Sequence, residues 1–188
     1  MTPGDQDPDL APALQRGDRV AWDQFYRRLY PRLRSYFIRR LGHDGAEDAV
    51  SETMTKAIAA IDRYTPGAVG LEGWLFGIAR HVNADHHRRS ARVARQQQVA
   101  HLVDGCGLES RMPVDHDLDL SDEHAHVRSQ FGRLEPAEQE VLELRVVAGL
   151  SANEVAAVLD KDPGAVRTFQ SRALAHLRRL VEADRVDA

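Results

Sequence analysis

A short basic segment near the carboxyl end, DPGAVRTFQSRALAHLRR (residues 162–179), constrains the fold of this chain more than any other stretch. Asp162 can accept hydrogen bonds from the amides of the following turn, and Pro163 suits the first helical position, where its missing N–H costs nothing. Apolar side chains then recur at three- and four-residue steps, at Val166, Phe169, Ala173, Leu177 and Leu180. The segment is therefore predicted to be an amphipathic helix.

The opposite side of this helix is polar, basic and small. Arginines and short hydroxyls gather near its start, where they could reach base edges in a major groove, while the later arginines could meet phosphate. The candidate DNA-contacting residues are Arg167, Thr168, Ser171, Arg172, Arg178 and Arg179. The alternative is a helical hairpin that only packs its stripe into a core and leaves its arginines in solvent.

The residues just upstream favour the DNA-binding interpretation. Ser151 and Glu154 form a capping-box pattern, which predicts a short helix ending near Leu159. Only residues 160–162 separate it from the basic helix, so the pair is predicted to be a helix-turn-helix. Asp160 stands where a left-handed backbone is often needed, and aspartate tolerates that conformation.

Helical periodicity also dominates upstream, whereas strand-like alternation is nearly absent, so the fold is predicted to be all-α. One apolar stripe runs from Trp22 to Leu41, with Pro31 expected to break it into two helices, and a second helix follows Gly45. A third helix follows the turn TPGAVG (65–70) and is expected to present an aromatic and cationic outer side suited to a strand of nucleic acid. That outer side carries Phe76, Arg80, Asn83 and His87, and basic residues from Arg88 onward continue it.

Charge and composition divide the chain into two small helical domains. Acids are dense between Asp104 and Glu123, a stretch without a helical stripe, so residues 99–128 are expected to form an acidic, flexible linker. The remaining expectations are a disordered tail (1–15), an N-terminal domain (16–98) and a helix-turn-helix domain (129–188).

The function classes that composition argues against are membrane proteins, secreted proteins and enzymes. The chain has a single cysteine, no secretory signal and no apolar run long enough to span a bilayer, which predicts a cytoplasmic protein without membrane insertion. Its nine histidines lack the spacing of a zinc site, and no phosphate loop or nucleophile motif occurs, so no catalytic residue, metal or cofactor is expected.

Three segments in order carry a family resemblance: GAEDAVSETMTKAIAAIDRY (45–64), WLFGIARHVNADHHRR (74–89) and LEPAEQEVLELRVVAGLSANEVAAVLDKDPGAVRTFQSRALAHLRR (134–179). Together they resemble bacterial RNA polymerase sigma factors of the extracytoplasmic-function group. The resemblance implies that residues 16–98 are sigma region 2 and residues 129–188 sigma region 4. It also implies promoter-specific initiation with core RNA polymerase, and an anti-sigma factor as a further partner.

The resemblance assigns roles to residues at matching positions. Glu47, Asp48, Ser51 and Glu52 match the helix that docks on core polymerase. The set Phe76, Arg80, His81, Asn83, His87 and Arg88 falls in the part that holds the melted −10 element, and the basic helix matches the reader of the −35 element. This chain departs from the family pattern at Ser51, Met54 and His81, where glutamine, phenylalanine and asparagine are usual.

A free-standing helix-turn-helix regulator is the alternative function. Such a protein would bind its operator without polymerase, usually as a dimer on spaced half-sites. No dimerisation heptads appear in the sequence, and the N-terminal domain has a basic face of its own.

Overall fold

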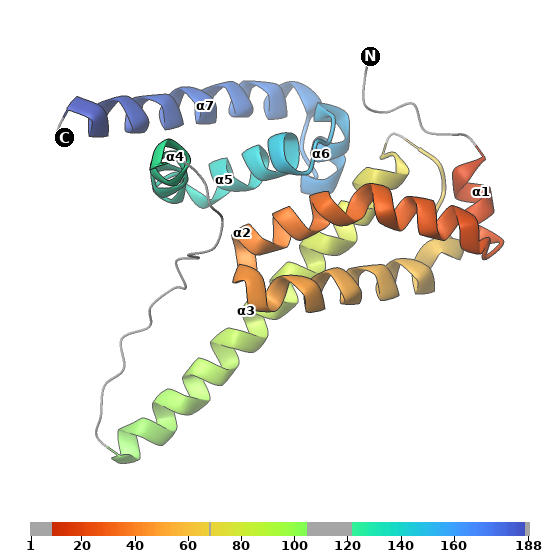
Figure 1. Ribbon diagram of the computed structural model, residues 1–188, viewed down its shortest axis with the longest axis horizontal. Coiled ribbons are helices and arrows are strands. Elements are labelled where there is room, and N and C mark those ends of the chain that lie inside the picture. Colours follow the sequence, from red (N-terminus) through yellow and green to blue (C-terminus); the bar gives the residue numbers. More distant parts are fainter. Residues whose placement is uncertain (1–8, 68, 105–121, 187–188) are drawn as a thin grey trace.

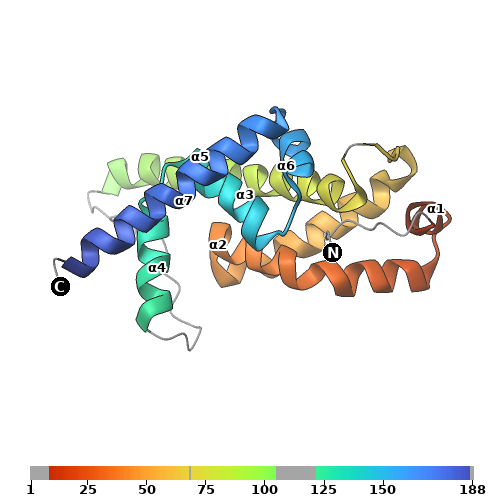
Figure 2. The same cartoon turned by 90° about the horizontal axis from the view of Figure 1, so that it is seen from above.

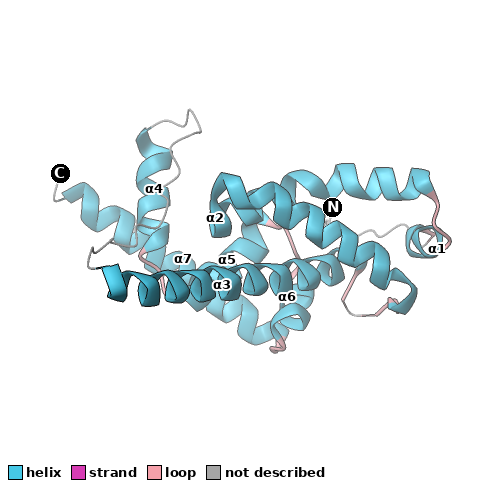
Figure 3. Ribbon diagram, turned by 90° about the horizontal axis from the view of Figure 1, so that it is seen from below, coloured by secondary structure: helices cyan, strands magenta, loops and turns pink. Residues whose placement is uncertain are grey.

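The computed structural model describes residues 9–67, 69–104 and 122–186 (Figure 1). Within these ranges every regular element is a helix (Figure 3), which confirms the predicted all-α class. The N-terminal domain comprises α1 (Leu10–Gln15), α2 (Arg19–Ala60), the 3-10 turn η1 (Ile61–Arg63) and α3 (Leu71–Asp104). The C-terminal domain comprises α4 (Asp122–Gly132), α5 (Pro136–Leu142), the π turn η2 (Glu143–Val147), α6 (Ala152–Leu159) and α7 (Pro163–Val186).

Helix α2 is a hairpin whose two halves lie side by side in Figure 1. The chain reverses at Gly42, which has φ 75° and ψ 177°, a conformation that glycine adopts without steric cost. The predicted break at Pro31 is wrong, because the helix continues through that residue. The predicted apolar stripes are largely confirmed, with Phe25, Leu33 and Val50 among the side chains buried between the helices.

The expectation of disorder up to residue 15 is also wrong, because residues 10–15 form α1. Leu14 is fully buried, and the indole N–H of Trp22 donates to its carbonyl at 3.1 Å. The Gln15 amide donates to the carbonyls of Ile61 and Tyr64. These contacts hold the short helix to both ends of the α2 hairpin.

Helical structure extends into both sides of the expected linker. Helix α3 continues to Asp104 and projects beyond the α2 hairpin, while α4 begins at Asp122 (Figure 1). The linker boundaries of 99 and 128 are therefore too wide. Residues 105–121, the rest of that segment, lie outside the described residues.

The two domains share one buried apolar cluster. It contains Leu75 and Phe76 of α3 together with Leu144, Val155 and Val166 of the C-terminal domain. Figure 2 shows α5 and α6 lying over α3. A second, smaller cluster is formed within the C-terminal domain by Leu134, Leu142 and Ala173.

Candidate nucleic-acid interface

The turn between α6 and α7 has the geometry of a helix-turn-helix. The Ser151 hydroxyl accepts from the Glu154 amide at 3.2 Å, and the Glu154 carboxylate accepts from the Ser151 amide at 2.8 Å, which confirms the capping box. Asp160 ends α6 with φ 52° and ψ 52°, in the left-handed region expected for it. Val166 is fully buried in the angle between the two helices.

Asp162 caps α7 as predicted. Its Oδ1 accepts from the amides of Gly164 at 2.7 Å and Ala165 at 3.1 Å. This cap and the burial of Val166 set the rotation of α7 about its axis, because a helix with one face packed must present the other face to solvent.

The polar side of α7 is open along its whole length. All six candidate residues are exposed, namely Arg167, Thr168, Ser171, Arg172, Arg178 and Arg179. The Thr168 hydroxyl donates to the Gly164 carbonyl at 3.1 Å, so it meets a ligand as an acceptor. The helix therefore offers a row of exposed guanidinium groups and short polar side chains, and a DNA major groove is wide enough to admit an α-helix.

The outer side of α3 differs from the sequence expectation at two positions. Phe76 is fully buried, with its ring edge-on to Tyr36 at a centroid distance of 5.9 Å and the Arg32 guanidinium 5.7 Å from its centroid. Asn83 is 5% exposed. Both predictions of an exposed position are wrong, because α3 packs against α2 on one side and beneath α6 on another.

The remaining four α3 candidates have access to solvent. His81, His87 and Arg88 are exposed. The Arg80 side chain is 42% exposed, and its Nε donates to Glu140 of α5 at 2.8 Å. The basic character of this side of α3 is therefore retained without the aromatic ring.

The acidic face of α2 contains both paired and solvent-facing carboxylates. Glu47 accepts from Arg34 at 2.7 Å and from the Tyr30 hydroxyl at 3.0 Å, and the hydrogen bond from Arg34 is the main reason that its pKa is lowered. Asp48 and Ser51 are exposed on the same face.

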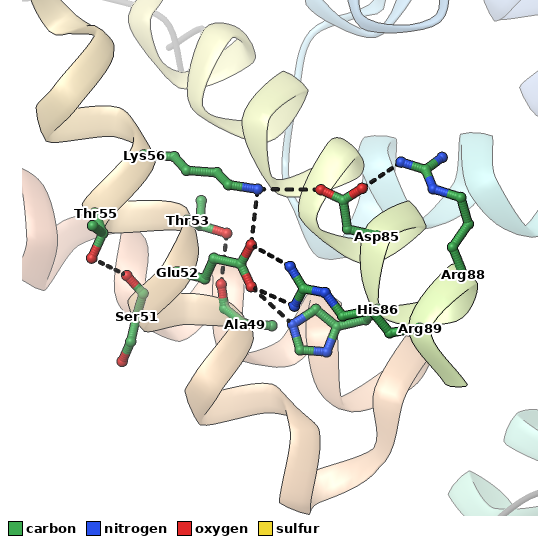
Figure 4. A network of polar contacts seen from close by, with 10 residues as sticks. All are labelled: Ala49, Ser51, Glu52, Thr53, Thr55, Lys56, Asp85, His86, Arg88 and Arg89. Carbon is green, nitrogen blue, oxygen red and sulfur yellow. Dashed lines mark hydrogen bonds and ion pairs between the residues drawn. The ribbon is translucent and has the colours of Figure 1, made fainter. Parts of the chain in front are cut away.

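Glu52 is the centre of a charged network between α2 and α3 (Figure 4). Its carboxylate contacts Lys56 at 2.8 Å, Arg89 at 3.2 Å and the His86 ring at 3.3 Å. Hydrogen bonds from Lys56 and then Arg89 lower the pKa of Glu52 to about 2. Glu52 therefore joins two helices of the domain, a structural role that the family resemblance does not assign to it.

The network continues from Lys56 to Asp85 of α3. Asp85 contacts Arg88 and, at 3.3 Å, Lys56 (Figure 4). Arg88 and then Lys56 lower the pKa of Asp85. One end of this network is thus a candidate DNA-contacting arginine.

Sequence reasoning does not identify three arginines that join the domains. Arg32 donates to the Ala148 carbonyl, Arg40 contacts Glu143, and Arg80 contacts Glu140. Their partners lie 60 to 116 residues away in the sequence, so no local signal could have revealed the pairs.

The described residues contain no helix that is long and apolar enough to cross a membrane. Among the same residues, no group of three or more His, Cys, Asp or Glu side chains could hold a metal ion.

Two family models match the chain in order. The model for sigma-70 region 2 matches residues 25–93, and the model for sigma-70 region 4 matches residues 127–177. The first match covers most of the α2 hairpin and the part of α3 up to residue 93, and the second covers α5, α6 and the part of α7 up to residue 177.

Curated relatives carry the same family name. The chain is 33% identical to the ECF RNA polymerase sigma factor BldN of Streptomyces coelicolor over 177 residues, which is 94% of this chain and 66% of BldN. It is 33% identical to the ECF sigma factor ShbA of Streptomyces griseus, covering 72% of this chain and 71% of ShbA. It is 32% identical to the ECF sigma factor SigD of Mycobacterium tuberculosis, covering 86% of this chain and 77% of SigD.

Two solved complexes contain chains of similar fold. CnrH, in complex with the cytosolic domain of CnrY, superposes with a TM-score of 0.63 and 28% identity over 93% of this chain and 96% of CnrH. The sigma factor RpoE of Bartonella quintana, in complex with the anti-sigma factor NepR, also gives a TM-score of 0.63 and 28% identity, over 86% of this chain and 97% of RpoE.

Proposed function

This chain belongs to the extracytoplasmic-function group of RNA polymerase sigma factors, and on that premise we propose that it binds core RNA polymerase and directs initiation at a specific class of promoters. The observation that carries the proposal is the exposed basic face of α7, held outward by a capped helix-turn-helix turn, on the same chain as a region 2 helix hairpin. The proposed function involves no enzymatic step and no cofactor. We expect the protein in the cytoplasm, where it would meet the polymerase.

Recognition of the −35 element is assigned to α7. Arg167, Thr168, Ser171 and Arg172 occupy its first turns, where a recognition helix meets base edges. Arg178 and Arg179 lie two to three turns further along, where contacts with phosphate would fix the register without reading sequence.

Recognition of the −10 element is assigned to the exposed side of α3. Arg80, His81, His87 and Arg88 supply its donors and positive charge. Phe76 and Asn83 are buried, so we assign them to the support of this surface rather than to contact with DNA.

Docking on core polymerase is assigned to the acidic face of α2. Asp48 and Ser51 are its exposed members, and Glu47 is held in place by Arg34 and Tyr30. Glu52 adds structural support through its contacts with α3. An anti-sigma factor is proposed as a further partner, since both superposed sigma factors were solved in complexes, one of them with a named anti-sigma factor.

In vitro transcription with purified core polymerase tests the proposal. Sigma-free core and a pool of bacterial promoter fragments should produce specific run-off transcripts only when this chain is added. A gel shift on the same fragments, with and without core, tests the free-standing regulator. Tight sequence-specific binding by the chain alone, together with no core-dependent transcript, would reject the proposal in favour of that alternative.

A further inference from the structure

The later part of α3 is a helical segment that lies open to solvent. It projects past the α2 hairpin (Figure 1), and every residue from 90 to 95 is exposed. The first turns of the same helix differ, because Leu71, Leu75 and Val82 are buried there. More than a full turn of helix is therefore accessible to a partner from every side.

This segment carries charge of one sign only. Residues 86–103 contain four arginines and neither aspartate nor glutamate, although the whole chain has a formal net charge of −4. A helix face that only contacts solvent commonly carries both signs, as the first half of α2 does with its ion pair between Asp23 and Arg27. An unbalanced run of arginines points instead to a partner with negative charge.

Three of these arginines share one face of α3. At 3.6 residues per turn, Arg88, Arg92 and Arg95 fall within about 60° around the helix axis, and they extend over about 10 Å along it. The phosphates of one DNA strand recur about every 3.4 Å along a duplex. A row of three guanidinium groups of this length can therefore contact neighbouring phosphates of one strand.

The two outer arginines of this face are not held by other side chains of the chain. Within the described residues, Arg92 and Arg95 have neither an ion pair nor a side-chain hydrogen bond. Arg88 contacts Asp85, yet its side chain remains 72% exposed. The positive charge of Arg92 and Arg95 is therefore available to a partner without the loss of an internal contact.

The chemistry of this face suits duplex DNA better than a melted strand. Proteins hold single strands with aromatic side chains, on which the unpaired bases stack. Residues 88–95 contain no aromatic side chain, and Phe76, nearer the start of α3, is fully buried. Guanidinium groups that contact only phosphate fix the position of a duplex without reading its sequence.

We propose that Arg88, Arg92 and Arg95 form a basic arm that contacts phosphates of the duplex next to the melted −10 element, on the side that leads to the −35 element. Arg88 belongs to the surface assigned above to the −10 element, so the arm continues that surface along α3. The chain runs on from α3 to the helix-turn-helix, which is why the end of α3 is assigned to the −35 side. The inference rests on the proposed function in the assignment of α3 and α7 to the two promoter elements.

The salt dependence of DNA binding tests the arm without knowledge of the promoter. Binding of a labelled random-sequence duplex by the free chain is measured by fluorescence anisotropy at several salt concentrations. Each phosphate contact adds about 0.9 to the slope of log affinity against log salt concentration. Arg92→Gln combined with Arg95→Gln should therefore lower this slope by about two and lower the affinity at least fivefold, with unchanged helicity, because glutamine is as good a helix former as arginine.

Two matched variants separate the position of the charge from its amount. Arg16→Gln combined with Arg63→Gln removes the same charge from exposed sites at α1 and η1, far from the end of α3 (Figure 1), and should change the affinity less than about twofold. Arg92→Lys combined with Arg95→Lys keeps the charge and should keep the slope. Equal slopes for the two glutamine double variants would overturn the proposal.

Directed cleavage then locates the arm on a promoter. Ala91→Cys in a Cys106→Ser background provides a single thiol beside the arm, to which an iron–EDTA reagent that cuts nearby DNA is coupled. With core polymerase, on a fragment recovered by the run-off assay above, cuts should fall in the duplex between the −10 and −35 elements. Cuts confined to the melted segment or downstream of it, or no cuts, would overturn the proposal. If no fragment is transcribed, the proposed function fails, while the salt slopes still report on the arm.

Discussion

Replacing Phe76 decides whether its ring supports the domain or contacts DNA. The ring is fully buried beside Tyr36 and Arg32, so Phe76→Ala removes a core side chain and leaves a cavity. Such substitutions lower the free energy of unfolding by about 3–5 kcal/mol. A domain of ordinary stability has about 5–15 kcal/mol in total, so this variant should be severely destabilised.

Phe76→Leu separates the volume of the ring from its aromatic contacts. It retains most of the apolar volume but loses the edge-on contact with Tyr36, so the expected loss is about 1–2 kcal/mol. Tyr26→Ala is a control at an aromatic that is 40% exposed on α2, and it should cost less than about 1 kcal/mol.

Urea unfolding followed by far-ultraviolet circular dichroism measures all three variants. The expected order of unfolding midpoints, from lowest to highest, is Phe76→Ala, Phe76→Leu, Tyr26→Ala. The reasoning is refuted if Phe76→Ala keeps the wild-type midpoint but transcribes poorly from a template that requires strand opening. That result would mean that the ring is exposed in solution and contacts DNA.

Four further predictions concern the reading helix, the docking face, the helix-turn-helix turn and the charged network. Arg172→Ala should cost about 1–3 kcal/mol of binding free energy on the correct −35 element and relax the preference at one base pair. Arg179→Ala should weaken binding to all sequences alike and lower the slope of log affinity against log salt concentration by roughly one. Equal losses on every single-base variant for Arg172→Ala would contradict its role in base recognition. Asp48→Lys should weaken core polymerase binding about tenfold at low salt with unchanged helicity, measured by fluorescence anisotropy, and wild-type affinity would remove Asp48 from the docking face. Asp160→Gly should raise the free energy of unfolding by up to about 1 kcal/mol, because glycine adopts the left-handed backbone of this position without strain. Asp160→Val should lower it by at least that much, because a β-branched side chain disfavours this conformation. Urea midpoints in the reverse order would contradict the turn geometry. Glu52 has a pKa of about 2, below its ordinary 4.5, so the stabilisation by its ion pairs is complete above pH 4.5 and is lost as the pH falls toward 2. Glu52→Gln should lower the free energy of unfolding by about 1 kcal/mol at neutral pH and by less in acid. A loss that does not depend on pH would exclude the ionic contribution.

The sequence by itself determined the local structure of the reading unit. The caps at Ser151 and Asp162 and the left-handed Asp160 involve groups within a few residues of each other. A single apolar stripe also suffices to orient α7, because this helix packs along one side only, so the exposure of Arg172 followed from the position of Val166.

Tertiary structure decided the features that depend on a second packing partner. Helix α3 lies against α2 and also beneath α6, so a residue off its main stripe, such as Phe76, is buried all the same. The spacing of apolar residues along the sequence indicates one buried face of a helix, but it does not indicate a second buried face. The position of the chain reversal, at Gly42 rather than at Pro31, likewise depends on how the two halves of α2 pack against each other.

The charged contacts between domains were beyond sequence reasoning for the same physical reason. Arg80 meets Glu140 and Arg40 meets Glu143 only because the shared apolar core brings α5 and η2 onto the N-terminal domain. Each arginine could form an ion pair with any of several carboxylates in the sequence. Which pairs form is decided by the burial of apolar surface, because that burial sets how the domains pack. The local sequence therefore determined the caps and the polar face of each helix, and the packing of the two domains determined which of these side chains are exposed.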